Sequence, residues 1–403
     1  KKEDFMKVSL KKAAVKAFFA FIGITGLITL TVNSVSVAKD TYIAVRDTVS
    51  AGSGMNDIMK GVVRGAENGF SSNLFGQNSF IDIYGLVEKA AGRRYILDAD
   101  SSYNIIKDDS GKLHFLSFRE DNSAAVDEIA AMNETLKKNG IDFLYVQTPI
   151  KYIKGFTKID PSLTDYSNEN SDKIVARLRE SGVNVFDLRN LLDDDRIDKG
   201  TLFYDTDHHW RIETAFWGAG RTAEKIKTLF GRDMDPEGFY TDFGNYRSET
   251  YEDSFLGSQG RRVGRYFAGT DDFTLVTPDF DTDYEVTVKK KDSVDTFEGD
   301  FSQAVIRRDI LEDKDIFTNR YVSYFGADYP EVIINNKAAE NDLKLLIVKD
   351  SFGIPFSAFM SLMASETRML DMRYYKDGTA EEYALEYRPD IVLYVFRSIR
   401  TIE

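Results

Sequence analysis

Apolar positions in the middle of the chain follow two different periods. Residues 123–138 carry them at helical spacing, every three or four positions: Val126, Ile129, Ala130, Met132 and Leu136. Asn122 or Ser123 is suited to cap the start of this helix, and Gly140 follows its last turn. The continuous apolar run IDFLYVQTP, residues 141–149, then predicts a buried strand.

This alternation continues towards the C-terminus. DKIVARLRES predicts a helix and GVNVFDL a strand, while apolar residues from Ile212 to Phe230 recur at helical spacing. LLIV within residues 343–348 predicts a buried strand before a helix near Pro355, and TRMLDMR and PDIVLYVFR predict two more strands. Alternating helices and strands indicate an α/β fold with a parallel sheet. The two-residue alternation of DYEVTVKKK indicates a β-rich insertion, at about residues 235–335.

The N-terminal region has the pattern of a membrane anchor. Residues 17–38 carry no charged side chain and follow a basic segment, residues 1–16, with six lysines. A helix of roughly 20 residues crosses the hydrocarbon layer, and the leading positive charges place the N-terminus in the cytoplasm. A cleaved signal segment is the alternative, and a buried helix of a soluble domain is a third interpretation. We expect a stem at residues 39–94 and one catalytic domain at residues 95–403, both outside the membrane.

Composition excludes several classes of protein. The chain of 403 residues has 52 Lys+Arg against 66 Asp+Glu, a formal net charge of -14. This charge disfavours a nucleic-acid partner, because it repels phosphate. The absence of cysteine rules out disulfides, thiolate zinc sites and a thiol nucleophile. It is compatible with a cytoplasmic protein and with an exported one.

Two of the three histidines stand side by side in FYDTDHHWRIE, at the start of the predicted helix near Ile212. In an extended segment Asp207 and His209 share a face that His208 does not, which disfavours a metal site formed by both imidazoles. An aspartate beside a histidine accepts the Nδ1 proton and leaves Nε2 as a base. The alternative is that Asp207 caps the helix while His209 and Trp210 pack.

A candidate nucleophile lies about 140 residues downstream, in LLIVKDSFG. Ser351 follows a predicted buried strand and precedes a helix, so it is expected at the carboxyl end of the strand, where ligands bind in α/β sheets. Backbone N–H groups of the helix start can then stabilise an oxyanion. Alternatively, Ser351 or Asp350 only caps the helix.

These motifs resemble a known family. TDHHW before a helix, LLIVKDSFG, QTPIKY after a strand and RPDIVLYVFR are similar to the DHHW proteins of Gram-positive bacteria. Those proteins are in turn similar to the SGNH hydrolase-like domain of alginate O-acetyltransferases. The resemblance implies a three-layer α/β/α fold with a mostly parallel sheet, circularly permuted so that Asp-x-His precedes Asp-Ser. It also implies that Ser351 is the nucleophile, His209 the general base and Asp207 its orienting partner. Lys349 departs from the family pattern, which has glycine there.

The resemblance implies an extracytoplasmic O-acetyltransferase that acts on a cell-surface or exported polysaccharide. Such an enzyme is expected to need no cofactor or metal, and a membrane-bound O-acyltransferase would supply its acetyl groups. The alternatives are a secreted serine carbohydrate esterase, a non-catalytic glycan-binding scaffold and a metal-dependent hydrolase.

Further residues are candidates for contact with the sugar. Lys151 and Tyr152 follow the strand at 141–149, and Arg262 lies in the basic segment GSQGRRVGRYF, while Trp210 adjoins the histidine pair. Each of them has a structural alternative: Lys151 and Tyr152 form a turn after the strand, Arg262 lies in a solvated loop, and Trp210 packs in the core. His114, alone in KLHFLSF, is expected to be structural.

Overall fold

The computed structural model describes residues 16, 20, 23–28, 31–50, 54–71, 76–98, 100–195 and 197–399. Contacts between residues divide the chain into two units, Lys1–Ile83 and Tyr84–Glu403. The first unit contains a hairpin of two helices, α2 (Ser34–Ser50) and α3 (Met55–Ser71). These helices approach closely, because a side chain at Gly65 would lie 2.5 Å from the Cα atom of Thr41. Helix α4 (Gln77–Ala90) spans the boundary between the two units.

The expected membrane anchor at residues 17–38 lies partly outside the described residues, which omit 17–19, 21, 22, 29 and 30. Within the described part of the chain, no helix combines the length and the apolar character needed to cross a bilayer. Residues 39–94, the predicted stem, contain most of α2 and all of α3 and α4, and α2 begins within the predicted anchor.

The second unit is built around a mixed sheet of eight strands in the order β5-β4-β13-β11-β12-β10-β8-β9. The first five strands of this order pair in parallel, and the remaining pairs are antiparallel. The expectation of a mostly parallel sheet therefore holds for one half of it. The strands are β4 (Asp142–Gln147), β5 (Val185–Asp187), β8 (Tyr284–Lys289), β9 (Val294–Gly299), β10 (Glu331–Asn336), β11 (Lys344–Lys349), β12 (Glu366–Leu370) and β13 (Ile391–Phe396).

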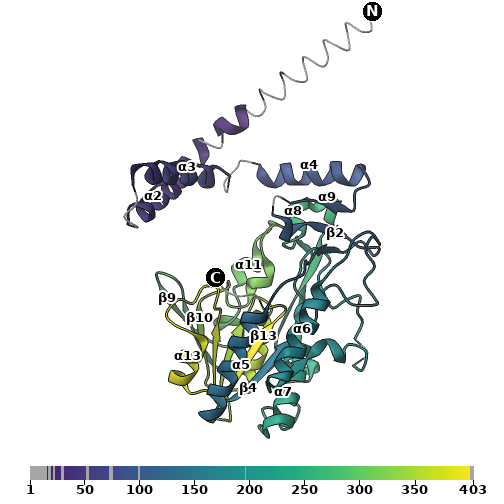
Figure 1. Cartoon of the computed structure of the whole chain (residues 1–403), viewed down its shortest axis with the longest axis vertical. Coiled ribbons are helices and arrows are strands. Elements are labelled where there is room, and N and C mark those ends of the chain that lie inside the picture. The colour runs from purple at the N-terminus through teal and green to yellow at the C-terminus, as the bar shows by residue number, and fades with distance from the viewer. Residues whose placement is uncertain are drawn as a thin grey trace, which may run out of the picture. The chain divides into compact units, whose positions relative to one another are not determined.

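Helices cover both faces of the parallel half, as Figure 1 shows. Successive side chains of a strand point to opposite faces, and in β4 Leu144 and Val146 pack into one apolar cluster while Phe143 and Tyr145 pack into another. The first cluster contains residues of α7 (Ile212–Phe230) and α12 (Gly353–Met360). The second contains residues of α5 (Ser123–Lys138), α6 (Ser167–Glu180) and α13 (Ala380–Tyr387). The expected three layers are therefore present.

The predicted β-rich insertion divides between two sheets. Strands β6 (Tyr246–Phe255) and β7 (Asp271–Pro278) form a separate antiparallel ribbon, whereas β8 and β9 extend the main sheet. Strand β8 joins the core because its alternate residues Tyr284, Val286 and Val288 are buried. Short helices accompany these strands: α8 (Gly260–Val263), α9 (Arg265–Ala268), α10 (Phe301–Ala304) and α11 (Arg308–Glu312).

A small antiparallel sheet stands at the entry to the second unit, formed by β1 (Tyr95–Ile96), β2 (Ile105–Lys107) and β3 (Leu113–Phe115). His114 lies on β3, and its Nε2 atom is 2.9 Å from Oδ2 of the buried Asp108. This position agrees with a structural role for His114.

Candidate active site

The turn after β11 presents Ser351 at the carboxyl end of the strand. The Oδ1 atom of Asp350 accepts a hydrogen bond from the backbone N–H of Phe352 (2.9 Å), and its carbonyl accepts one from Gly353 (3.0 Å). The tightness of the turn requires glycine at 353, because a Cβ atom there would lie 2.4 Å from Cβ of Lys349. The turn therefore holds Ser351 immediately before α12 begins.

A second loop, just before α7, carries Asp207. Its Oδ1 atom accepts a hydrogen bond from the backbone N–H of His209 (2.8 Å), and its Oδ2 atom accepts one from the backbone N–H of Ser258 (2.5 Å). The segment that contains Gly257 and Ser258 packs directly against this loop. Position 257 has no room for a side chain, because a Cβ atom there would lie 2.2 Å from Cβ of Asp207. Both carboxylate oxygens are thus held by the backbone.

Asp207, His209 and Ser351 form one chain of hydrogen bonds. The Nδ1 atom of His209 lies 2.5 Å from Oδ1 of Asp207, and its Nε2 atom lies 2.7 Å from Oγ of Ser351. Asp207 is fully buried, and burial raises its pKa, yet the adjacent imidazoles of His209 and His208 and the hydrogen bonds hold that pKa well below its ordinary value. An ionised carboxylate on Nδ1 keeps the proton there and leaves Nε2 able to accept the serine proton.

Two aromatic residues hold the imidazole of His209 in place. The ring of Tyr321, on the short 3₁₀ helix η4 (Arg320–Ser323), stacks on it with centroids 3.9 Å apart and planes 10° apart. The indole of Trp210 donates its Nε1–H to the hydroxyl of Tyr321 (3.0 Å) and to the carbonyl of Phe352 (3.2 Å). Sequence reasoning missed Tyr321, because no local pattern marks a residue that stacks on a histidine 112 positions away.

The Ser351 hydroxyl opens into a cleft of about 820 Å³. The cleft is lined by Asp207, His208, His209 and Ser351, by the aromatic residues Tyr103, Phe115 and Phe118, and by polar residues that include Asn319, Asp328 and Arg373. The backbone N–H of Ser351 has no hydrogen-bond acceptor among the described residues. Asn319 lines the same cleft and has a buried Oδ1 atom that lacks a partner, so its side-chain amide is a second polar group that sequence reasoning did not identify.

Lys349, the departure from the family pattern, is buried and does not enter this cleft. Its ammonium lies 2.6 Å from Oδ1 of Asp328 and 3.0 Å from Oδ2 of Asp371. Arg373 pairs with the same two carboxylates, so the charges of two cations and two anions neutralise one another. A lysine at position 349 is therefore compatible with the turn because it has its own charged partners.

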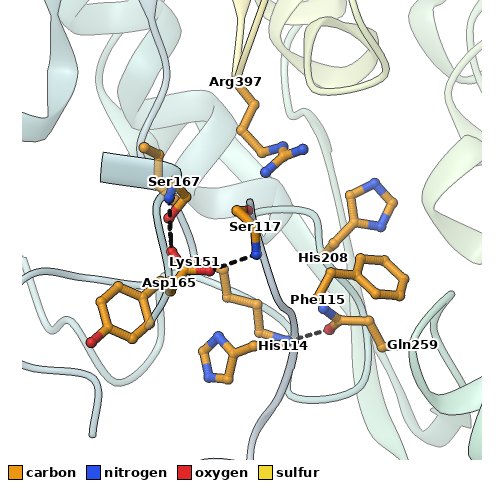
Figure 2. Close-up of a pocket in the computed structure, with 11 residues that line it drawn as sticks. His114, Phe115, Ser117, Lys151, Asp165, Ser167, His208, Gln259 and Arg397 are labelled. Atoms are coloured by element: carbon orange, nitrogen blue, oxygen red, sulfur yellow. Dashed lines mark hydrogen bonds between the residues drawn. The ribbon is translucent and has the colours of Figure 1, made fainter. Parts of the chain in front are cut away.

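Four residues expected to contact the sugar do not line the cleft of Ser351. Trp210 is fully buried, and Arg262 is exposed, where it pairs with Asp98 and lies over the ring of Tyr103. Tyr152 lies at a separate small pocket of about 30 Å³, shown in Figure 2. These side chains lie outside the lining of the cleft, and their contact with a sugar stays a prediction.

Lys151 supports the Asp207 loop from behind. Its ammonium donates hydrogen bonds to the backbone carbonyls of Asp205 (3.0 Å) and Asp207 (2.7 Å) and to Oε1 of Gln259 (2.8 Å), the last drawn as a dashed line in Figure 2. Burial lowers the pKa of Lys151 to about 8, although nearby aspartates oppose this shift. The geometry therefore assigns it to holding the loop.

His208 also differs from the sequence expectation. Residues 205–209 form bends and do not extend as a strand, so the rings of His208 and His209 lie on the same side, with centroids 3.8 Å apart. One possible ligand atom each of Asp207, His208 and His209 falls within 4.8 Å of the others, a spacing compatible with a metal. Both oxygens of Asp207 already accept hydrogen bonds, however, and this favours proton transfer over metal binding.

Comparisons with known proteins agree with the resemblance. Residues 117–255 match the family model of the SGNH hydrolase-like domain of the acetyltransferase AlgX, a match that includes Asp207 and His209 and ends before Ser351. A comparison with curated proteins gives no significant sequence match.

Solved structures with the same fold include PatB1 of Bacillus cereus, with 20% identity, a TM-score of 0.61 and coverage of 74% of this chain and 98% of that chain. A second PatB1 structure, with a sulfonyl adduct, also has 20% identity, with a TM-score of 0.59 and coverage of 74% and 95%. A DHHW family protein of Eubacterium siraeum has 18% identity, a TM-score of 0.54 and coverage of 75% and 92%. The protein therefore has an SGNH-like α/β fold with a mixed sheet, and its residues 117–255 are similar to the SGNH hydrolase-like domain of AlgX.

Proposed function

We propose that this protein is an extracytoplasmic O-acetyltransferase that modifies a polysaccharide through an acetyl-serine on Ser351. The observation that carries the proposal is the chain of hydrogen bonds from Asp207 through His209 to Ser351, which ends in an open cleft. The match to the domain of an acetyltransferase supports the acetyl group as the group transferred.

The first half of the proposed reaction forms the acetyl-enzyme. Nε2 of His209 takes the hydroxyl proton of Ser351 while Oγ attacks the carbonyl carbon of the acetyl donor. The backbone N–H of Ser351, which has no acceptor among the described residues, donates to the resulting oxyanion in this proposal. The oxyanion then collapses, His209 gives its proton to the leaving group, and the acetyl group stays on Oγ. General-base assistance contributes about 10² to 10⁴ in rate, and one oxyanion donor about 10² to 10³.

In the second half, the hydroxyl of a sugar attacks the acetyl-serine. His209 removes the proton of this hydroxyl, and collapse returns the proton to Oγ of Ser351. The three aromatic residues of the cleft, Tyr103, Phe115 and Phe118, offer faces on which sugar rings can stack. A membrane-bound O-acyltransferase is the proposed source of acetyl groups, with residues 17–38 as the proposed anchor beside it.

A serine esterase is the second candidate, and a specific observation favours it. Ser351 is partly exposed in an open cleft, so water has access to an acetyl group on its Oγ atom. Transfer and hydrolysis therefore differ only in which nucleophile reaches the acetyl-serine first.

Intact-mass spectrometry of the full chain after brief incubation with 4-nitrophenyl acetate tests the proposal. We expect one added acetyl group on the wild type and none on Ser351→Ala, while Ser302→Ala on α10 serves as a matched serine control. Faster loss of the adduct with oligosaccharides, together with acetylated sugar, supports transfer. Loss to water alone supports the esterase, and no adduct on the wild type contradicts both.

A further inference from the structure

We propose that His208 binds the acyl acceptor, by a hydrogen bond between its Nε2 atom and the hydroxyl that takes the acetyl group from Ser351. This inference rests on the proposed function and assigns its acceptor site. It concerns the second imidazole of the pair, which has no part in the hydrogen-bond chain from Asp207 to Ser351.

His208 is anchored through one nitrogen only. Its Nδ1 atom lies 2.6 Å from Oγ of Ser258, whereas its distance to Oδ1 of Asp207 is 3.7 Å, too long for a hydrogen bond. Ser258 thus holds two residues of the site: its backbone N–H binds the carboxylate of Asp207, and its hydroxyl binds the imidazole of His208.

The other nitrogen of His208 has no partner in the described part of the chain and belongs to a side chain that lines the cleft. Among the described residues, Nε2 has no hydrogen-bond partner, and it is absent from the buried polar atoms that lack one, so it is accessible to solvent. The side chain of His208 is 28% exposed, against 7% for His209, and it lines the same cleft as Ser351. His208 also lines the small pocket drawn in Figure 2, where it lies on the same side as Phe115.

The placement of the ring suits a hydroxyl acceptor. Because the two imidazoles lie 3.8 Å apart between centroids, a hydroxyl held by His208 is next to the base that must remove its proton. Burial and the neighbouring His209 lower the pKa of His208 well below its ordinary value, so the ring stays neutral. When Nδ1 accepts the hydroxyl proton of Ser258, the neutral ring carries its own proton on Nε2. Nε2–H then donates to the oxygen of the acceptor hydroxyl and leaves the proton of that hydroxyl to His209.

Two substitutions of His208 distinguish the contribution of its Nδ1 atom from that of its Nε2 atom. The amide of asparagine reaches about as far as Nδ1 of histidine, so His208→Asn keeps a polar group near Ser258 and leaves none at the position of Nε2. The amide of glutamine reaches about as far as Nε2, so His208→Gln restores a polar group in the cleft. Ser258→Ala removes the hydroxyl that holds His208 and leaves the backbone N–H that holds Asp207.

The experiment measures how much of the acetyl-enzyme reacts with the acceptor and how much reacts with water. The full chain is acetylated with 4-nitrophenyl acetate in the presence of chitopentaose, cellopentaose or glycerol, and acetylated acceptor and free acetate are both measured. The ratio of transfer to hydrolysis does not depend on how fast the acetyl-enzyme forms. It is therefore insensitive to general damage of the hydrogen-bond chain.

We expect His208→Asn to lower the ratio about tenfold, the effect of losing one hydrogen bond in the transition state. His208→Gln should recover most of the ratio, and Ser258→Ala should lower it about threefold. His209→Asn should instead fail to form the acetyl-enzyme. Thermal unfolding of each variant shows that it is folded.

Two results overturn the inference and are distinguishable. A ratio in folded His208→Asn equal to that of the wild type, with transfer occurring, refutes the role of His208 and leaves the proposed function intact. A wild type that forms the acetyl-enzyme but transfers to none of the three acceptors contradicts the transferase function, and the acceptor site with it.

Discussion

The indole Nε1–H of Trp210 lies 3.2 Å from the carbonyl oxygen of Phe352, the residue that follows Ser351. This contact joins the loop that carries His209 to the turn that carries the serine, across 142 positions of the sequence. The same N–H reaches the hydroxyl of Tyr321, whose ring stacks on His209. One buried side chain therefore sets the distance between the base and the nucleophile.

Replacing Trp210 by phenylalanine should loosen this arrangement. The substitution removes the N–H donor and leaves a gap in the core, so we expect about 1–3 kcal/mol lower stability and about tenfold lower esterase activity. The chain offers a matched control in its only other tryptophan, because Trp217 donates its Nε1–H to Asp195, outside the site. Urea unfolding and 4-nitrophenyl acetate turnover measure both. If Trp217→Phe lowers activity equally, Trp210 has no special role.

Replacing Lys151 by methionine tests the support behind the Asp207 loop. Two backbone carbonyls and the Oε1 atom of Gln259 would lose their donor, and each unsatisfied buried group costs about 1–3 kcal/mol. We expect a loss of at least about 3 kcal/mol in the free energy of unfolding, by urea titration, with lower activity. Lys154→Met, at an exposed lysine, is the control. A variant as stable as that control would show that the three hydrogen bonds contribute nothing.

Gly257→Ala should displace Asp207 without changing any titratable group. A methyl group at position 257 meets Cβ of Asp207 at 2.2 Å, and the alanine cannot be accommodated unless the loop moves. A misplacement of about 1 Å at a catalytic group costs about 10²-fold in rate, so we expect a loss of this order in kcat. Gly54→Ala has no atom within 4 Å of the added methyl and should behave as the wild type. Normal kcat in Gly257→Ala would mean that the loop adapts.

Asp108 should contribute to the dependence of stability on acid pH. Burial opposes its ionisation, but the hydrogen bonds from His114 and Ser110 prevail and lower the pKa of Asp108 to about 2. A carboxyl group with a lowered pKa in the folded state stabilises it above its unfolded pKa, about 3.9, and this contribution is lost as the pH falls towards 2. We expect Asp108→Asn to be about 2 kcal/mol less stable at pH 6, and the difference to shrink below pH 4. Urea unfolding at several pH values measures it, and a constant difference would contradict the assignment.

The local elements were largely predictable. Helices α5 and α7 and strands β4, β11 and β13 lie where the apolar periodicity placed them, because one-sided burial imposes a period of 3.6 in helices, and burial on both faces gives the short apolar runs of central strands. The divided β-rich insertion was not predictable, because alternation shows that β8 has a buried face and does not show which sheet it joins.

The candidate site was also predictable in part. Asp207 and His209 could be paired from the sequence, because residues two apart interact locally and the aspartate can hold the histidine Nδ1. Ser351 could be chosen from its place between a strand and a helix. That Nε2 of His209 meets Oγ of Ser351 at 2.7 Å, however, depends on the order of strands in the sheet and on Trp210 and Tyr321.

The sequence by itself therefore determined the elements, the Asp-x-His and Asp-Ser motifs and their family resemblance, since each depends on residues close together in the chain. Tertiary structure alone decided that His208 lies beside His209, that Lys151 holds the loop from behind and that Lys349 has two aspartates as partners. The first depends on the bends at residues 205–209, which contacts with other segments hold in place. The other two join residues from different segments, and only packing and charge pairing in the folded chain bring such side chains together.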